Sequence, residues 1–373
     1  MAGSGAAATE GRGFFPSIAL MRAVAALLVV YDHLVGIWLE RSKVAFAPAA
    51  FADRWLFEPL HIMAHGGSLA VALFFLVSGF VIVFVAQRET LRQFAIRRLL
   101  RIYPPLWASS VILIVIFAAI LAAPSSHVLH RYAANSALAS DSPAADTLLA
   151  LTLGNYLAGT PPVNGVAWTL VIEVFFYVCV ALLLPLLKSR PRLALAVAFA
   201  GLALLQACAK TSGFVFLLAV NGVYVSYLFL GSLVYFRWDG RIGNRFFLAG
   251  SLAFAGLFLH GVREIVLEAP WTFADYGVSY LLAWLCFVCF LLLDDRIRLG
   301  RVSDFFSRIS YSLYLNHGGL GLMAITLLFP FLGYPLSLLV AFGLVVAVSA
   351  ASWRYVEVPS QRLAKRLTAA PGA

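Results

Sequence analysis

Charged residues are scarce in this 373-residue chain: aspartate, glutamate, lysine and arginine together make up 12% of it, whereas hydrophobic residues make up 62%. No polar block is long enough to form a soluble domain. This composition excludes an ordinary water-soluble protein and indicates a polytopic membrane protein. We therefore expect an all-α transmembrane bundle forming a single domain over residues 1–373, with flexible cytoplasmic tails at 1–13 and 363–373.

Cysteine is also rare. Its four occurrences all lie in apolar segments, where neither a secreted disulfide framework nor a hydrophilic zinc site is natural: Cys179, Cys208, Cys286 and Cys289. His61 and His65 have the i, i+4 spacing of two metal ligands on a helix, but no third ligand is evident beside them. We predict no metal site and no permanently bound cofactor.

About ten apolar runs are long enough to cross a bilayer. They cover residues 14–39, 68–86, 103–123, 163–187, 192–209, 221–236, 246–260, 275–293, 308–330 and 333–353. A shorter run at 145–158 has the length of a re-entrant or interfacial segment. The sequence therefore predicts about ten spans and one segment that enters the membrane without crossing it.

The net charge of +10 could suggest a nucleic-acid ligand, but the distribution of the basic residues argues against one. With the N-terminus in the cytoplasm, 20 of the 27 lysines and arginines fall in cytoplasmic segments. This asymmetry follows the positive-inside rule and predicts that both termini are cytoplasmic. The excess charge thus needs no nucleic-acid partner.

An arginine and a histidine stand inside the first apolar run. Arg22 and His33 are eleven residues apart, which is about three helical turns, so both side chains fall on one face about 16 Å apart along the axis. Ionisable groups are costly in hydrocarbon and usually mark function. We take the pair as the first candidate for a functional site.

Two further spans carry charged groups. Arg98 and Arg101 share a helix face at the cytoplasmic start of the third span, where guanidinium forks could bind phosphate oxygens, although plain positive-inside anchoring is an equal alternative. Glu173 lies near the middle of the fourth span, with Thr169 and Tyr177 one turn to either side as hydrogen-bond partners. Its alternative role is to pair with an arginine and hold helices together.

The ninth span begins with a polar stripe. Ser310, Tyr314 and His317 fall at i, i+4 and i+7 and are expected to face the bundle interior. Taken alone, such a histidine could also serve only to bond a neighbouring helix. In the second span the small pair Ser78-Gly79 predicts a close approach of another helix.

These segments occur in a particular order along the chain: Arg22-x10-His33, Phe74-Phe75-Leu76-Val77-Ser78-Gly79-Phe80, Arg98-x-x-Arg101, Trp168-Thr169-Leu170 with Glu173 and Tyr177, Ser310-Tyr311 to His317, and Glu357-x-Pro359. In that order they resemble the acyltransferase 3 family of bacterial membrane O-acyltransferases, over about residues 16–362. Threonine replaces the usual serine after Trp168. With only a short tail after the last span, the chain resembles the stand-alone type that modifies exopolysaccharide or O-antigen.

The resemblance implies a multi-pass protein of the bacterial inner membrane that takes acyl-CoA, acetyl-CoA in the first instance, as a cytoplasmic co-substrate. The acceptor would be a hydroxyl of a cell-surface or lipid-linked glycan. The sequence leaves open which acyl group is moved, which hydroxyl receives it and whether the protein is a homodimer.

Roles follow from this resemblance and from the chemistry of the residues. His33 is the expected general base, with a transient acyl-histidine as the variant mechanism. Glu173 is expected to orient His33 or to hold the acceptor, whereas Asp32, about 100° away from His33 on a helical wheel, is a weaker candidate. Arg22, Arg98 and Arg101 are expected to bind the acyl donor. The residues expected to line the same cavity are Ser310, Tyr311, Tyr314 and His317.

Two other classes of function stay open at this point. In a proton-coupled transporter or flippase, the buried ionisable residues would form a proton or substrate pathway. In an accessory scaffold of a polysaccharide export machine, loss of His33 would leave the acyl content of the product unchanged. Neither alternative explains the Arg22-x10-His33 spacing or the basic Arg98-x-x-Arg101 turn.

Overall fold

Nine helical stretches in the computed structural model are long and apolar enough to cross a membrane, counted over residues 15–267 and 271–369, which the structure describes. They are Pro16–Ser42, Ala64–Ala86, Leu91–Ala122, Gly165–Ser189, Pro191–Thr211, Gly213–Trp238, Asn244–Val266, Phe273–Leu292 and Arg301–Leu367. The last is 67 residues long and is broken at Gly333, whose φ of 67° and ψ of 171° are not helical. It accommodates the two final spans expected from the sequence, and the all-α bundle is confirmed.

The elements of the first half follow one another as α1 (Pro16–Tyr31), η1 (Asp32–Ile37), α2 (Trp38–Ser42), α3 (Ala47–Ala52), η2 (Asp53–Phe57), η3 (Ala64–Gly66), α4 (Gly67–Ala86), α5 (Leu91–Ala122), α6 (His130–Ala134), η4 (Ala137–Ala139), α7 (Pro143–Leu151), α8 (Asn155–Ala158), η5 (Gly165–Ala167) and α9 (Trp168–Ser189). The second half comprises α10 (Pro191–Ala207), η6 (Ala209–Thr211), α11 (Gly213–Trp238), α12 (Asn244–Gly261), η7 (Val262–Val266), α13 (Phe273–Leu292), η8 (Asp294–Arg296), α14 (Arg301–Asn316), η9 (His317–Gly321), α15 (Leu322–Ser352), η10 (Trp353–Glu357) and α16 (Val358–Leu367).

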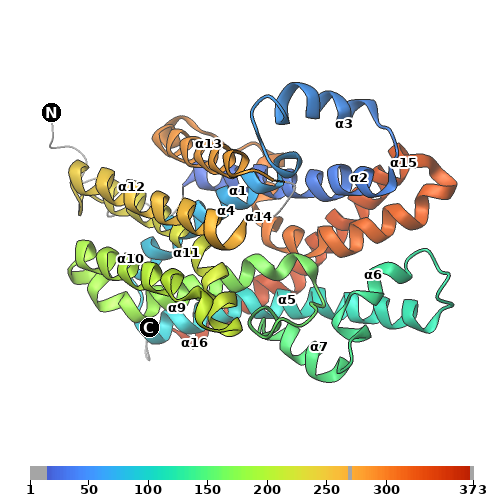
Figure 1. The fold of residues 1–373 in the computed structure, drawn as a ribbon, viewed down its shortest axis with the longest axis horizontal. Helices are drawn as coiled ribbons and strands as arrows, with labels where there is room; N and C mark the ends of the chain where they lie inside the picture. The colour runs from blue at the N-terminus through green and yellow to red at the C-terminus, as the bar shows by residue number, and fades with distance from the viewer. Residues whose placement is uncertain (1–14, 268–270, 370–373) are drawn as a thin grey trace.

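The centre of the bundle is built around α4, which packs against α1, α11 and α13 (Figure 1). At its crossing with α11, Gly79 faces the backbone of Leu228, and Gly231 faces the backbone of Leu76, with no room for a Cβ atom at either glycine. Ser232 donates a hydrogen bond of 3.1 Å to the carbonyl oxygen of Gly79. The close helix approach expected beside Ser78-Gly79 is therefore confirmed, since small residues let two helix backbones touch.

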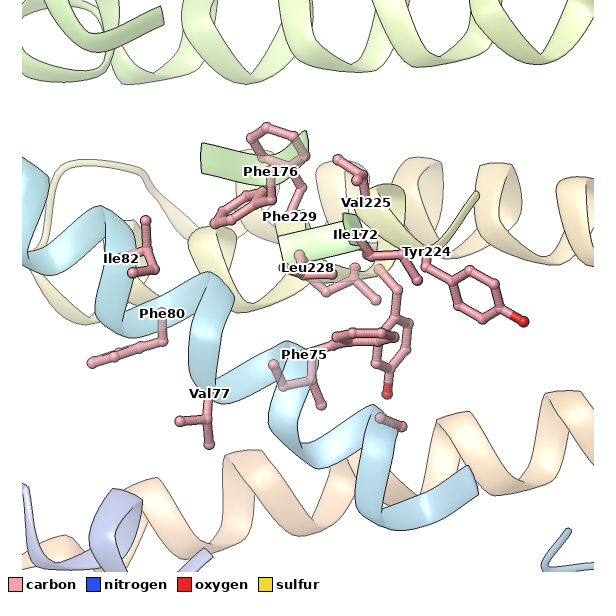
Figure 2. Packing of buried hydrophobic residues seen from close by; sticks show 14 of the residues in the cluster. Phe75, Val77, Phe80, Ile82, Ile172, Phe176, Tyr224, Val225, Leu228 and Phe229 are labelled. Carbon is pink, nitrogen blue, oxygen red and sulfur yellow. The ribbon is translucent and has the colours of Figure 1, made fainter. Parts of the chain in front are cut away.

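Aromatic and aliphatic side chains fill the space between α4, α9 and α11 (Figure 2). Phe80 is fully buried and its ring meets those of Tyr235 and Phe287 edge to face. Phe176 meets Phe229 in the same manner at 5.1 Å. This packing fixes α4 and α9 relative to each other, and both helices contribute walls of the cavity described below.

Two helices that carry predicted site residues continue as π-helices. The π-helix η1 follows α1 and contains His33, and the π-helix η9 follows α14 and begins at His317. A π-helical turn holds more residues than an α-turn, so it changes which side chains share a face. Hydrophobic periodicity in the sequence carries no signal for these turns.

The segment expected to be re-entrant contains only short helices, α7 and α8, followed by a loop to α9. Asn164 in that loop is buried and donates hydrogen bonds of 3.1 and 2.9 Å to Ser109 Oγ and to the carbonyl oxygen of Leu315. The loop is thereby tied to α5 and α14, next to His317.

The expected tails differ in outcome. Residues 1–13 lie outside the described part of the chain. The tail expected from 363 overlaps α16, which continues to Leu367 and packs along α5. Thr368 is buried and accepts a 2.9 Å hydrogen bond from Arg97 Nε, while Gln93 bonds its carbonyl oxygen. Within the tail predicted at 363–373, the residues up to Thr368 are therefore held against α5 by contacts that the local sequence does not reveal, and residues 370–373 lie outside the described part of the chain.

Candidate active site

A cavity of about 300 Å³ lies among α1, α4, α5, α9 and α14. It extends from the ends of these helices that are predicted to be cytoplasmic, at Phe15 and Ser307, toward the middle of the bundle at Thr169 and Tyr314. Seven of the residues given a catalytic, donor-binding or lining role from the sequence line it: Arg22, Arg98, Arg101, Glu173, Ser310, Tyr311 and Tyr314. The tertiary structure thus brings together side chains from four separate spans.

Arginines dominate one end of the cavity. Arg22 donates a 2.9 Å hydrogen bond to Ser310 Oγ, which links α1 to α14. Arg98 lies 3.4 Å from the carboxylate of Glu89, and Arg97 lies 3.0 Å from the same oxygen. Arg101 has no hydrogen-bond or ion-pair partner among the described residues. Of the three predicted donor-binding arginines, Arg101 is the one whose guanidinium is free for a ligand.

Glu173 forms hydrogen bonds inside the cavity wall. Tyr177 on its own helix and Ser78 on α4 both donate to its Oε1, the latter at 3.3 Å. The predicted partner Tyr177 is therefore in place, whereas Thr169 donates instead to Tyr314 Oη at 2.8 Å. The charge of Glu173 acts on Arg22, Arg98 and Arg101, so this carboxylate balances the charge of the arginine end.

Tyr314 closes the inner end of the cavity. Its hydroxyl accepts the hydrogen bond from Thr169 and donates one of 2.7 Å to the carbonyl oxygen of Val166. Its ring centroid lies 5.6 Å from that of His317. The ring of His317 is thus the neighbour of a cavity-lining tyrosine, and His317 itself is not among the residues that line this cavity.

His33 and His317 face each other beyond Tyr314. Their ring centroids are 4.5 Å apart at an interplanar angle of 87°. Nδ1 of His33 lies 3.2 Å from the carbonyl oxygen of Val29, and Nδ1 of His317 lies 2.6 Å from that of Tyr314. A carbonyl accepts only, so each Nδ1 carries the proton and each Nε2 keeps a free lone pair. His317 Nε2 is buried and has no partner among the described residues.

The carboxylate beside His33 is Asp32, not Glu173. Asp32 Oδ2 lies 3.4 Å from His33 Nδ1, and Asp32 is 5% exposed. Glu173 instead lines the cavity and accepts hydrogen bonds from Tyr177 and Ser78, so its role of orienting His33 or of holding the acceptor stays a prediction. The helical-wheel argument against Asp32 fails because residues 32–37 form a π-helix, in which neighbouring side chains lie closer in direction than the 100° of an α-helix.

The two outer histidines weighed as metal ligands bond different carboxylates. His61 Nδ1 lies 3.2 Å from Asp275 on α13, whereas His65 Nδ1 lies 2.7 Å from Asp53 on η2. The chain between them is not helical, so the i, i+4 spacing does not place the two rings on one face.

A family model described as an acyltransferase domain matches residues 15–354, nearly the whole chain. The chain belongs to the acyltransferase 3 family. No curated protein and no solved structure matches it significantly. Membership makes this helical bundle a membrane acyltransferase, and it covers every residue of the cavity and both histidines. The acyltransferase thus holds its Arg22 and His33 on one helical unit, both directed toward the α14 and η9 segment.

One functional candidate escaped sequence reasoning. Glu89 is 4% exposed and pairs with Arg97 and Arg98. Its signal in the sequence is a lone acid directly after the second span, in an otherwise basic loop. Asp32 is recognised as a carboxylate next to His33 but ranks low, because the π-helical backbone of residues 32–37 has no signal in the sequence.

Proposed function

We propose that this acyltransferase moves an acyl group, acetyl in the first instance, from cytoplasmic acyl-CoA to a hydroxyl of a cell-surface or lipid-linked glycan. It acts as a multi-pass O-acyltransferase of the bacterial inner membrane. The observation that carries the proposal is a cavity lined by Arg101 of α5, which has no hydrogen-bond or ion-pair partner among the described residues, and walled by α1 and α14, the two helices that continue into the turns of His33 and His317.

The cavity suits the donor arm. Its volume of about 300 Å³ is at the lower end for ligand sites, so it fits an acyl-pantetheine arm and leaves the nucleotide outside. Arg101 and Arg98, at the basic side of the bundle, are the residues for the donor phosphates, because guanidinium forks bind phosphate oxygens in pairs. The arm then points toward Tyr314. Its acyl end reaches the histidines when the Tyr314 ring swings aside.

The histidines supply the base. An alcohol is a poor nucleophile until its proton is being removed, and a neutral imidazole is suited to removing it near pH 7. His33 is the better base of the two because 23% of its side chain is exposed, whereas His317 is fully buried. His317 is then the positioning residue that holds the His33 ring. A transient acyl-His33 remains the variant in which the same Nε2 attacks the thioester carbon.

The hydroxyl oxygen attacks the thioester carbonyl carbon while His33 Nε2 takes its proton. The new C–O bond forms, the C–S bond breaks, and the electron pair leaves with sulfur as the thiolate of CoA. Arg22, whose guanidinium lines the cavity, favours that negative charge electrostatically.

The test is turnover and donor binding by the purified full-length protein with labelled acetyl-CoA, then succinyl-CoA. His33→Ala is expected to keep donor binding and to lose about 10²- to 10⁴-fold in turnover, the range for removal of a general base. His260→Ala is the matched control, since this histidine is exposed on α12 and far from the cavity.

Three outcomes separate the candidates. Binding with turnover that depends on His33 supports the proposal. Folded protein that binds no acyl-CoA would sink it and favour the transporter or flippase. Binding with turnover that His33→Ala leaves unchanged would reject His33 as the base while keeping the acyltransferase.

A further inference from the structure

On the side of the bundle predicted to be outside, a strained loop packs against the π-helix that carries His33. His61, Ala64 and His65 have φ values of 48°, 50° and 44°, in the left-handed region that non-glycine residues rarely occupy, and Gly66 follows at 94°. Such backbone costs of order 1 kcal/mol or more per residue and persists where the surroundings fix it, often at functional sites.

The loop and the π-helix interlock through two glycines. The His65 ring fills the space where a Cβ of Gly36 would be, and the Asp32 carboxylate fills the space where a Cβ of Gly67 would be. His65 and Asp32 are therefore side chains of neighbouring layers, each seated on the other layer's glycine. His65 is also the first charged group that acts on Asp32 from a neighbouring element, followed by Glu40.

A row of proton-carrying groups results. Asp32 Oδ2 lies 3.4 Å from His33 Nδ1, and its other oxygen, Oδ1, is buried without a partner among the described residues. His65 Nδ1 lies 2.7 Å from Asp53 Oδ1. Asp32 is 5% exposed, whereas the His65 and Asp53 side chains are 27% and 28% exposed. Two links, His33 to Asp32 and His65 to Asp53, therefore lie in neighbouring layers, and the second is the more exposed.

The other groups around the row are few. Arg41 acts electrostatically on His33, Glu40 on Asp32 and Asp53 on Tyr31, and the Phe57 ring meets the His65 ring edge to face at 6.4 Å. Glu40 is a second carboxylate near Asp32, but His65 is the base whose ring is seated on the π-helix, at Gly36.

We propose that Asp32, His65 and Asp53 relay the proton that His33 takes from the acceptor to the outer surface. This inference rests on the proposed function. The proton on His33 Nε2 is balanced by release of the Nδ1 proton to Asp32, which becomes neutral. Asp32 passes that proton to the free nitrogen of His65, and the Nδ1 proton of His65 leaves through Asp53 to water outside. The CoA thiolate takes its own proton from cytoplasmic water, so no other reactant is needed.

The experiment measures acetyl-CoA hydrolysis, with water as the acyl acceptor, from pH 6 to 9 in purified full-length protein. His65→Ala is expected to lower kcat about tenfold, less than loss of the base itself, with KM unchanged because His65 is not among the residues that line the donor cavity. Added imidazole should restore the rate, since it can occupy the vacated ring site and carry the proton. A role of His65 in structure alone predicts no rescue.

The matched control is His61→Ala. His61 lies in the same strained loop and also bonds an aspartate, but 61% of its side chain is exposed and it faces α13. It should keep the wild-type rate and pH profile. If His65→Ala does not fold, Asp53→Asn at the surface end of the row decides, with a several-fold loss of kcat expected.

Two results overturn the relay alone. In the first, the wild-type protein turns over and His65→Ala has the same kcat. In the second, His65→Ala is folded and has a lower kcat, but added imidazole does not restore the rate. A wild-type protein that neither hydrolyses nor transfers from acetyl-CoA would overturn the proposed function itself. The wild-type rate therefore distinguishes the two failures.

Discussion

Arg101→Ala should weaken acyl-CoA binding more than Arg98→Ala does, although the two arginines are one helical turn apart. Arg101 has no hydrogen-bond or ion-pair partner among the described residues, so its guanidinium can bind a phosphate without breaking an existing contact. Arg98 already contacts Glu89 at 3.4 Å, and a phosphate must compete with that carboxylate. Both side chains are arginines, so the expected difference in acyl-CoA affinity between the two variants comes from the residues around each guanidinium.

The magnitude can be worked from one charge-assisted hydrogen bond, which contributes about 1.5–3 kcal/mol. At 1.4 kcal/mol per factor of ten, Arg101→Ala should raise the Kd of CoA about 10- to 150-fold. Arg98→Ala should raise it by about fivefold or less, because the gained phosphate contact is offset by the lost Glu89 contact. Arg101→Lys keeps the charge without the fork and should fall between.

Calorimetric titration with CoA and with pantetheine, which lacks the nucleotide phosphates, separates phosphate binding from damage to the cavity. Arg101→Ala should lose affinity for CoA and keep its affinity for pantetheine. Arg92→Ala, an exposed arginine on the same helix, is the matched control and should bind both ligands as the wild type does. An equal loss for both ligands, or a larger loss for Arg98→Ala, would refute the reasoning.

Three other variants test separate parts of the structure. Asp32→Asn should lower kcat about 10- to 100-fold while donor binding is kept, because the amide cannot take a proton from His33; unchanged kcat would remove Asp32 from the site. Tyr314→Phe loses the bonds to Thr169 and Val166, so acetyl-CoA hydrolysis without acceptor should rise about fivefold as the ring moves more freely; a rate at or below wild type would contradict a gate. Gly231→Val should cost about 3 kcal/mol or more of unfolding free energy, since its side chain meets the α4 backbone, whereas Gly256→Ala on α12 has open space and should melt near the wild type.

The arginine and histidine of the first span illustrate what local spacing can predict. Eleven residues at helical rise place both groups on one face whatever the rest of the fold does, and the structure directs both toward α14 and η9. The same reasoning places Tyr177 next to Glu173, four residues away on one helix. The Tyr177 prediction succeeds because helical geometry alone brings residues four apart together, whereas Thr169, on the same helix, bonds Tyr314 of α14 instead.

Predictions that crossed between helices, or that assumed an α-helix where the backbone changes, did less well. Asp32 lies 3.4 Å from His33 where residues 32–37 wind as a π-helix, and the Tyr314 hydroxyl is held by Thr169 and Val166 from another part of the chain. The pairing of Arg98 with Glu89 likewise depends on how the loop after α4 returns to α5. None of these features has a periodic signal in the sequence.

The sequence by itself determined the membrane-embedded helical class, because so few charges and such long apolar runs cannot fold in water, and it determined the residues of the candidate site, because ionisable groups in hydrocarbon are too costly to be there without use. Only the tertiary structure decided which of those groups face one another. Partners from distant spans are chosen by packing, down to the two glycines that let Asp32 and His65 interlock. The sequence specifies the chemical type of each side chain, whereas the packing of the helices determines which side chains are its neighbours.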